Sequence, residues 1–253
     1  MASFPTKRQT YDDIGHGYGG FRIPDRRLMA ALGRQLGAAV SVLNVGAGTG
    51  SYEPRDRPVV AAEPSWTMIR QRPRGSAPAV RALGEALPFA DRTFDAALAI
   101  LTLHHWSDWR AGVAEMRRVS PRVVIQTWDP SHTGFWLTTD YFPDLLEVDR
   151  GIFPPIDDLV KALGGTVSVE PLPIPADCTD GFLGAYWCRP KVYLDNEAGR
   201  SISTFSRIRD VEKRIGRLAR DLETGRWHDR NGALLERDNL DLGYRLVTRA
   251  ADI

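Results

Sequence analysis

The stretch Val42–Ser65, VLNVGAGTGSYEPRDRPVVAAEPS, contains the features that predict the fold. An apolar run ends in a glycine-dense turn, and a short connection leads to a second apolar run that ends at Glu63. Gly46, Gly48 and Gly50 let the backbone pass beneath a ligand without a Cβ collision. A carboxylate at the end of the second run can accept hydrogen bonds from both hydroxyls of a ribose. The stretch therefore predicts a nucleotide-type site at the carboxyl ends of two parallel strands.

The bulk composition is ordinary for a water-soluble globular protein of 253 residues, and a net charge of +1 gives no electrostatic footprint for nucleic acid or acidic membranes. Residues 1–13 lack the apolar core of a signal peptide, and no segment has the ~18 apolar residues of a membrane helix. Cys178 and Cys188 are expected to be free thiols, and no Cys/His cluster that predicts a metal site accompanies them. We therefore expect a cytoplasmic protein that binds no nucleic acid, membrane or metal.

Strand and helix patterns alternate in the first half of the chain. Short apolar runs predict buried strands at 41–46, 58–63, 77–83, 93–101 and 121–128. Helical patterns occur between them, at 25–37, 64–72 and 106–119. This alternation predicts a parallel α/β sheet with right-handed crossovers. The loop from residue 50 to 58 is short, so the first crossover helix is expected to be truncated.

The second half has a different pattern. Residues 129–155 are rich in aromatic residues and prolines, a helix closed by glycine follows from Ile156, and a strand follows that helix. A second segment without strand character, 175–238, precedes a final strand at Asp241–Arg249. We expect one domain with cap-like insertions.

Two cofactors fit a glycine turn followed by a carboxylate: a dinucleotide and S-adenosylmethionine. The dinucleotide fingerprint, G-x-G-x-x-G, places a pyrophosphate at a helix N-terminus. Here the glycines run G-x-G-x-G and are followed by SYEP, in which Glu53 would face the phosphates and Pro54 constrains a helix. The turn therefore favours S-adenosylmethionine.

Four segments carry a resemblance to a known family: LNVGAGTG, AAEPSWTMI, GEALPFADRTFDAALAILTLHHW and AEMRRVSPRVVIQTWDP. In order and spacing they resemble the motifs of class I S-adenosylmethionine-dependent methyltransferases, nearest the ubiquinone/menaquinone-biosynthesis-like (methyltransferase type 11) group of actinobacterial type. The resemblance covers roughly residues 10–130. It implies a Rossmann-like seven-stranded, mostly parallel sheet of order 3-2-1-4-5-7-6, with the last strand antiparallel, helices on both faces and a helical, aromatic cap. The chain then divides into an N-terminal lid and first helix (1–37), a cofactor-binding core (38–128), cap insertions (129–155 and 175–238) and a final strand (239–253).

The resemblance also implies roles in binding S-adenosylmethionine and its product S-adenosylhomocysteine. Gly46, Ala47, Gly48 and Gly50 would lie under the methionine part, and Glu63 would bind the ribose. The remaining contacts would come from Pro64, Ser65 and Met68 near the adenine or ribose, from Leu83, Gly84 and Glu85 at the adenine edge, from Leu101 and Thr102 at the methionyl end, and from Tyr11 and Arg22 in the lid. Asn44 and Leu83 depart from the family pattern, which often has acidic residues at both positions.

Methyl transfer is an in-line displacement in which the protein mainly aligns the reactants and excludes water. A general base is needed where the acceptor loses a proton, and His105, ahead of His104, is the candidate because both follow a predicted strand. The alternative is that one histidine bonds the backbone and the other packs beside Trp106. Eight aromatic residues of the insertions are expected either to line an acceptor pocket or to pack the cap: Trp128, Phe135, Trp136, Tyr141, Phe142, Phe182, Tyr186 and Trp187.

The leading hypothesis is a methyltransferase that acts on a small organic acceptor. The alternatives are an NAD(P)-dependent oxidoreductase on a similar sheet and a non-catalytic, S-adenosylmethionine-binding or regulatory protein of the same fold. The charged helix predicted around 207–223 is a candidate dimer contact. The sequence does not specify the acceptor or the atom that is methylated.

Overall fold

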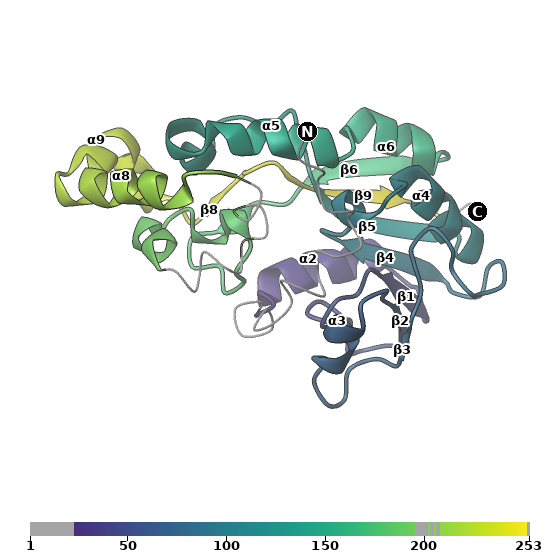
Figure 1. Cartoon of the computed structure of the whole chain (residues 1–253). Coiled ribbons are helices and arrows are strands. Elements are labelled where there is room, and N and C mark those ends of the chain that lie inside the picture. The colour runs from purple at the N-terminus through teal and green to yellow at the C-terminus, as the bar shows by residue number, and fades with distance from the viewer. Residues whose placement is uncertain (1–22, 196–201, 203–204, 206–207, 252–253) are drawn as a thin grey trace, which may run out of the picture.

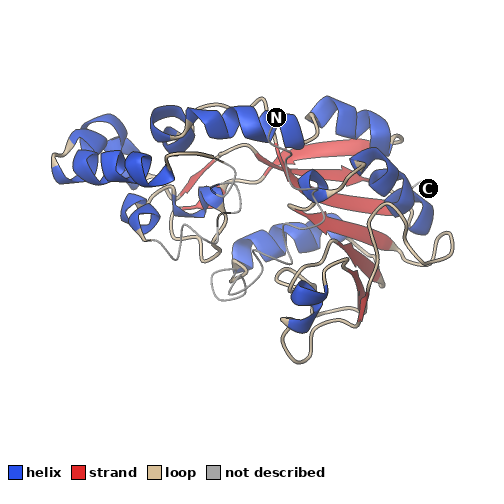
Figure 2. Cartoon of the chain, viewed as in Figure 1, coloured by secondary structure: helices blue, strands red, loops and turns tan. Residues whose placement is uncertain are grey.

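A seven-stranded sheet forms the body of the protein in the computed structural model, which describes residues 23–195, 202, 205 and 208–251 (Figures 1 and 2). The strand order is β3-β2-β1-β4-β5-β9-β6. β9 pairs antiparallel with both of its neighbours, and the other strand pairs of the sheet are parallel. The strands are β1 (Val42–Val45), β2 (Val59–Ala62), β3 (Ala79–Val80), β4 (Ala96–Ile100), β5 (Arg122–Trp128), β6 (Val167–Pro171) and β9 (Tyr244–Arg249). The predicted sheet order, with the last strand antiparallel, is confirmed.

Helices cover both faces of the sheet. α2 (Arg26–Leu36) packs on β5 and β9 from one side, whereas α4 (Trp109–Val119) and α6 (Ile156–Leu163) pack together on the other side (Figure 1). All four residues of β1 are buried, as expected for a central parallel strand covered on both faces. β6 forms one edge of the sheet, opposite β3, and most of its residues are exposed.

The ends of the helices follow from their capping residues. Asp25 caps α2 by accepting a hydrogen bond from the Arg27 amide, and Gly37 ends the helix with φ +57°. α4 begins at Trp109 rather than at Trp106, because Asp108 caps it through the amides of Arg110 and Ala111. The residues before this cap form a 3₁₀ turn, η2 (Leu103–His105).

The first crossover contains no helix between β1 and β2, where every residue is described. Residues 46–58 form turns and bends only, and the next helix, α3 (Trp66–Arg70), follows β2. The crossover helix, which was expected to be truncated, is therefore absent from this connection. A glycine turn without a helix behind it also has no helix N-terminus with which to hold a pyrophosphate.

The segments 129–155 and 175–238, together called the cap, form a helical lobe beside the carboxyl ends of the parallel strands (Figures 1 and 2). The sequence pattern did not predict α5 in the first of these segments. The first segment contains the π turn η3 (Leu137–Tyr141) and α5 (Pro143–Ile152). The second contains the helices α8 (Val211–Glu223) and α9 (Arg226–Asn231) and the 3₁₀ turns η4 (Leu183–Tyr186), η5 (Pro190–Leu194) and η7 (Gly232–Glu236). A short ribbon of β7 (Ile174–Pro175) and β8 (Asn239–Leu240) joins the two ends of the second segment. Among the described residues, no helix is long and apolar enough to span a bilayer.

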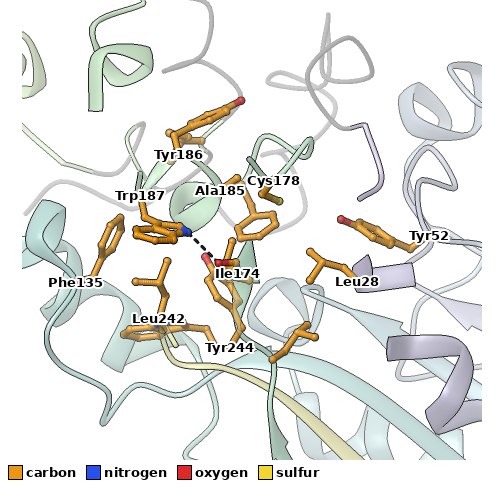
Figure 3. Close-up of a cluster of buried hydrophobic side chains, with 14 of the residues drawn as sticks. Leu28, Tyr52, Phe135, Ile174, Cys178, Ala185, Tyr186, Trp187, Leu242 and Tyr244 are labelled. Atoms are coloured by element: carbon orange, nitrogen blue, oxygen red, sulfur yellow. Dashed lines mark hydrogen bonds between the residues drawn. The ribbon is translucent and has the colours of Figure 1, made fainter. Parts of the chain in front are cut away.

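The cap and the α2 face of the sheet share one apolar cluster (Figure 3). Trp187 is fully buried there, and its indole donates to the Ile174 carbonyl at 2.9 Å. Trp136 in turn donates to the Trp187 carbonyl at 2.9 Å. All eight aromatic residues that were expected to line a pocket or to pack the cap are buried members of this cluster, so packing is the role that the structure shows for them.

Candidate cofactor site at the carboxyl edge of the sheet

The glycine turn after β1 has the left-handed backbone that its sequence requires. Gly46, Gly48 and Gly50 have φ values of +68°, +53° and +84°. The amides of Gly46 and Ala47 bond the Ala62 carbonyl of β2 at 2.8 and 3.2 Å, which ties the turn to the neighbouring strand. A Cβ at Gly48 would meet no atom of the described residues within 4 Å, so none of them packs against this part of the turn. We name residues 46–50 together with Glu63 the cradle.

Glu63 joins the two halves of the cradle. It is buried at the end of β2, and its carboxylate accepts the Gly48 amide at 2.8 Å and the Ser65 amide at 2.9 Å. Each amide occupies a different oxygen, and a carboxylate has about four acceptor positions. The carboxylate is therefore held in place by the turn on one side and by the start of α3 on the other.

A buried ion pair supports the cradle from below. The Arg72 guanidinium lies 2.6 Å from Glu53, and both side chains are less than 10% exposed (6% and 7%). Arg72 also donates to the Gly48 carbonyl at 3.3 Å, and Asn44 donates to Glu53 at 3.4 Å. The expectation that Glu53 would face a bound phosphate is wrong, because its carboxylate turns inward to Arg72. The feature that disfavours a dinucleotide is then the absence of a helix between β1 and β2.

The residues after Glu63 form the start of α3. The Ser65 hydroxyl caps this helix through the Met68 amide at 3.3 Å, and Met68 is buried. Pro64 is exposed, and its carbonyl accepts from Arg81 at 3.0 Å. These residues therefore lie next to the cradle carboxylate.

The segment expected at the adenine edge is held by the turn before α4. Leu83 forms an isolated bridge with Ala86, and a Cβ at Gly84 would lie 2.8 Å from the Trp106 ring. Glu85 accepts from the Ser107 amide and hydroxyl at 2.8 and 2.9 Å. Gly84 thus has a packing reason to be glycine, and Glu85 has a structural role whether or not it meets a ligand.

The end of β4 approaches the cradle closely. A Cβ at Gly46 would lie 2.1 Å from the hydroxyl oxygen of Thr102, which is buried. Leu101 has φ +47°, an uncommon conformation for a non-glycine residue, and its amide bonds the Gln126 carbonyl at 2.9 Å. Strained backbone of this kind often occurs at functional sites. Thr102 therefore lies directly against the first glycine of the turn, and Leu101 precedes it in the chain.

The two histidines lie at the same edge of the sheet. His104 is buried and stacks on Phe153 of the cap, with ring centroids 4.1 Å apart, and the two imidazole centroids are 3.8 Å apart. His105 is half-buried. His104 thus packs against Phe153 of the cap, and His105 is the more accessible candidate for a base.

Two expected contacts, Tyr11 and Arg22, lie outside the described residues. In the described part of the chain no three His, Cys, Asp or Glu side chains converge in a way that would hold a metal ion. Burial raises the pKa of the Cys178 thiol to about 12, which argues against a nucleophilic role.

Sequence reasoning missed the residues that hold the cradle from outside the motifs. Arg72 is one of these residues. Tyr52 is another, because its hydroxyl donates to Asp180 of the cap at 2.8 Å, across 128 positions of sequence. Neither residue belongs to a local pattern, and only the fold brings the two together.

Comparisons with known proteins agree with this site. The family described as "Methyltransferase domain" matches residues 43–122, which include the cradle and both histidines. A demethylmenaquinone methyltransferase of Corynebacterium urealyticum is 40% identical over 83 residues. That match covers 31% of this chain and spans only about a third, 36%, of the relative.

Solved structures extend the comparison to the cap. A putative methyltransferase from an antibiotic biosynthesis pathway of Anabaena variabilis is 31% identical, with a TM-score of 0.85 over 91% of this chain and 99% of that one. A possible histamine N-methyltransferase of Thermotoga maritima is 19% identical, with a TM-score of 0.52 over 66% of this chain and 84% of that one, and shows the fold alone. The fold, the cradle and the full-length relative agree, and the chain therefore belongs to the class I S-adenosylmethionine-dependent methyltransferases.

Proposed function

We propose that this protein transfers the methyl group of S-adenosylmethionine to a small organic acceptor by in-line displacement. The observation that carries the proposal is the buried Glu63 carboxylate at the end of β2, which accepts the Gly48 amide of the glycine turn at 2.8 Å. The names of two relatives support a small acceptor, because one refers to an antibiotic biosynthesis pathway and the other to demethylmenaquinone. Bound S-adenosylmethionine supplies a methyl group already activated on a sulfonium.

The chain's own residues would then bind, align and exclude water. In this proposal the glycine turn lies under the methionine part, Glu63 holds the ribose hydroxyls, and Leu101 and Thr102 border the methionyl end. His105 accepts a proton where the acceptor carries a hydroxyl or a similar group. The cap covers the reacting atoms.

Calorimetric titration of the wild-type protein with S-adenosylmethionine, S-adenosylhomocysteine and NADH tests the cofactor. We expect the first two to bind and NADH not to bind; binding of NADH alone would refute the proposal in favour of an oxidoreductase. Glu63→Ala should weaken S-adenosylhomocysteine binding by about 1–3 kcal/mol because hydrogen bonds to a charged acceptor are lost. The control is Glu147→Ala, an exposed position on α5, which should leave the affinity unchanged.

A screen of small hydroxyl, amine and carbon acceptors with radiolabelled S-adenosylmethionine tests turnover. Binding of the cofactor with no transfer to any acceptor would favour the non-catalytic alternative. With an acceptor in hand, His105→Gln should lower the rate by roughly 10²–10⁴, the usual contribution of a general base, and leave cofactor affinity intact. An unchanged rate would assign His105 a packing role. Dimer formation through α8 is a separate expectation, tested by light scattering.

A further inference from the structure

A buried hydrogen bond connects the chain just after the glycine turn of the cradle to the cap. Tyr52 follows the last glycine of the turn by two positions, and its hydroxyl donates to Asp180 at 2.8 Å. Tyr52 is 5% exposed and Asp180 is fully buried. In Figure 3 the Tyr52 ring extends toward the cap segment that carries Cys178. This bond thus joins the turn that borders the proposed cofactor to the lobe that covers it.

Asp25, the residue that caps α2, contacts both Tyr52 and the cap. The Asp25 amide donates to the Tyr52 hydroxyl at 3.4 Å, and the Asp25 carboxylate accepts the Thr179 amide at 3.2 Å. Asp180 also accepts the amide of Gly181 at 2.7 Å. The carboxylate of Asp180 is therefore fixed from the cap side, and Tyr52 meets it from the cradle side.

A displacement of the glycine turn would act on Tyr52 through a short linkage, because only Ser51 separates this residue from Gly50. No helix follows the turn to buffer such a movement. A hydrogen bond to a buried carboxylate is among the stronger ones in a protein, and losing it leaves that charge less compensated. Movement of the turn is thus transmitted to residues 178–181.

We infer that Tyr52 is a positioning residue that couples occupancy of the cradle to the packing of the cap segment 176–187, so that cofactor binding stabilises this segment against the sheet. The inference rests on the proposed function, because S-adenosylhomocysteine is the ligand that acts on the cradle. Coupling between two sites is reciprocal, so packing of this segment also tightens cofactor binding.

Amide hydrogen exchange, measured with and without S-adenosylhomocysteine, tests the coupling. In the wild type, ligand should slow exchange both in residues 46–65, which include the cradle, and in the cap segment 176–187. The cap segment should slow by about tenfold, as a hydrogen bond to a charged group implies. In Tyr52→Phe the cradle response should persist, and the cap response should fall below about twofold. The affinity of this variant should drop by roughly three- to tenfold, as reciprocity requires.

Two variants separate coupling from a merely structural role. Tyr193→Phe removes another buried hydroxyl bond, to the Leu183 carbonyl at 2.6 Å, but both partners lie in the cap. It should speed cap exchange equally with and without ligand and leave the ligand response intact. Asp180→Asn keeps a hydrogen-bonding partner for Tyr52, so this variant should retain most of the wild-type coupling.

A cap response in Tyr52→Phe equal to that of the wild type would overturn the inference. So would a change in cap exchange that is identical with and without ligand, as for Tyr193→Phe. Absence of any ligand response at the wild-type cradle would instead refute the proposed cofactor site.

Discussion

Asn44 donates a hydrogen bond to Glu53 at 3.4 Å, beneath the glycine turn. Relatives often have an acidic residue at this position, and the structure explains the amide. Glu53 occupies the space below the turn and is neutralised by Arg72 at 2.6 Å. A carboxylate at position 44 would bring a second negative charge to a pair that is already balanced.

Asn44→Asp should therefore destabilise the fold. We expect the free energy of unfolding to fall by about 1–3 kcal/mol at pH 7, because a buried donor is lost and like charges face each other. Urea denaturation measures this change. The double variant Asn44→Asp/Glu53→Gln should recover part of the loss, since an amide again faces a carboxylate. Strictly additive losses would show that the two side chains do not interact.

Substitution of the cradle glycines should separate stability from ligand binding. Gly46→Ala places a methyl group 2.1 Å from the Thr102 hydroxyl oxygen and keeps φ at +68°, so it should cost about 2–5 kcal/mol of stability. The methyl group of Gly48→Ala meets no atom of the residues that the structure describes, so a backbone strain of about 1–2 kcal/mol is the expected cost.

The ligand response of Gly48→Ala should be much larger than its effect on stability, because its methyl group would occupy space proposed for the cofactor. Titration with S-adenosylhomocysteine checks this point. Gly75→Ala is the matched control, since Gly75 also has a positive φ (+85°) and an open Cβ position but lies outside the cradle. Equal affinities for the two variants would contradict the placement of the cofactor over Gly48.

Asp25 should contribute a pH-dependent part of the stability. Its hydrogen bonds from Arg27 lower the pKa of the carboxyl from 3.8 to about 2. The folded protein therefore binds this proton less readily than the unfolded chain does. About 2 kcal/mol of stability is present above pH 4–5 and is lost as the pH falls toward 2.

Asp25→Asn isolates the charge, because asparagine is also a good N-cap. At pH 7 the variant should be less stable by about 2 kcal/mol, and the gap between variant and wild type should close as the pH approaches 2. Urea denaturation across this pH range provides the measurement. A gap that does not change with pH would show that the Asp25 charge is not responsible.

The cysteines should be unreactive in the native protein. Burial raises the pKa of both thiols, to about 12 for Cys178, so little thiolate is present at pH 8. Iodoacetamide labelling followed by peptide mass spectrometry should modify Cys188 first, because it is half-buried and Cys178 is fully buried. Rapid native labelling of Cys178, at the rate seen in urea, would contradict this.

The sheet could be predicted from sequence because its strands are covered on both faces and therefore appear as unbroken apolar runs. The cradle could be predicted because Gly46, Gly48 and Glu63 are local signals of backbone conformation and ribose binding. α5 was missed because Pro143 and the neighbouring aromatic residues are typical of loops as well as of a first helical turn.

The side chains that hold the site could not be predicted in the same way. Glu53 was interpreted by its nearness to the turn, but its direction is set by Arg72, nineteen positions away. Tyr52 and Asp180 are brought together only by the folded cap. Such pairings depend on tertiary geometry, which no local pattern contains.

The place of β9 in the sheet affects the order in which the protein can fold during synthesis. β9 lies between β5 and β6, yet the ribosome makes it after both of these strands and after the cap. Until residues 244–249 emerge, β5 and β6 each have an open edge that can pair with another chain. The nascent protein therefore completes its sheet only after the cap has been synthesised, and chaperones that shield strand edges would act in that interval.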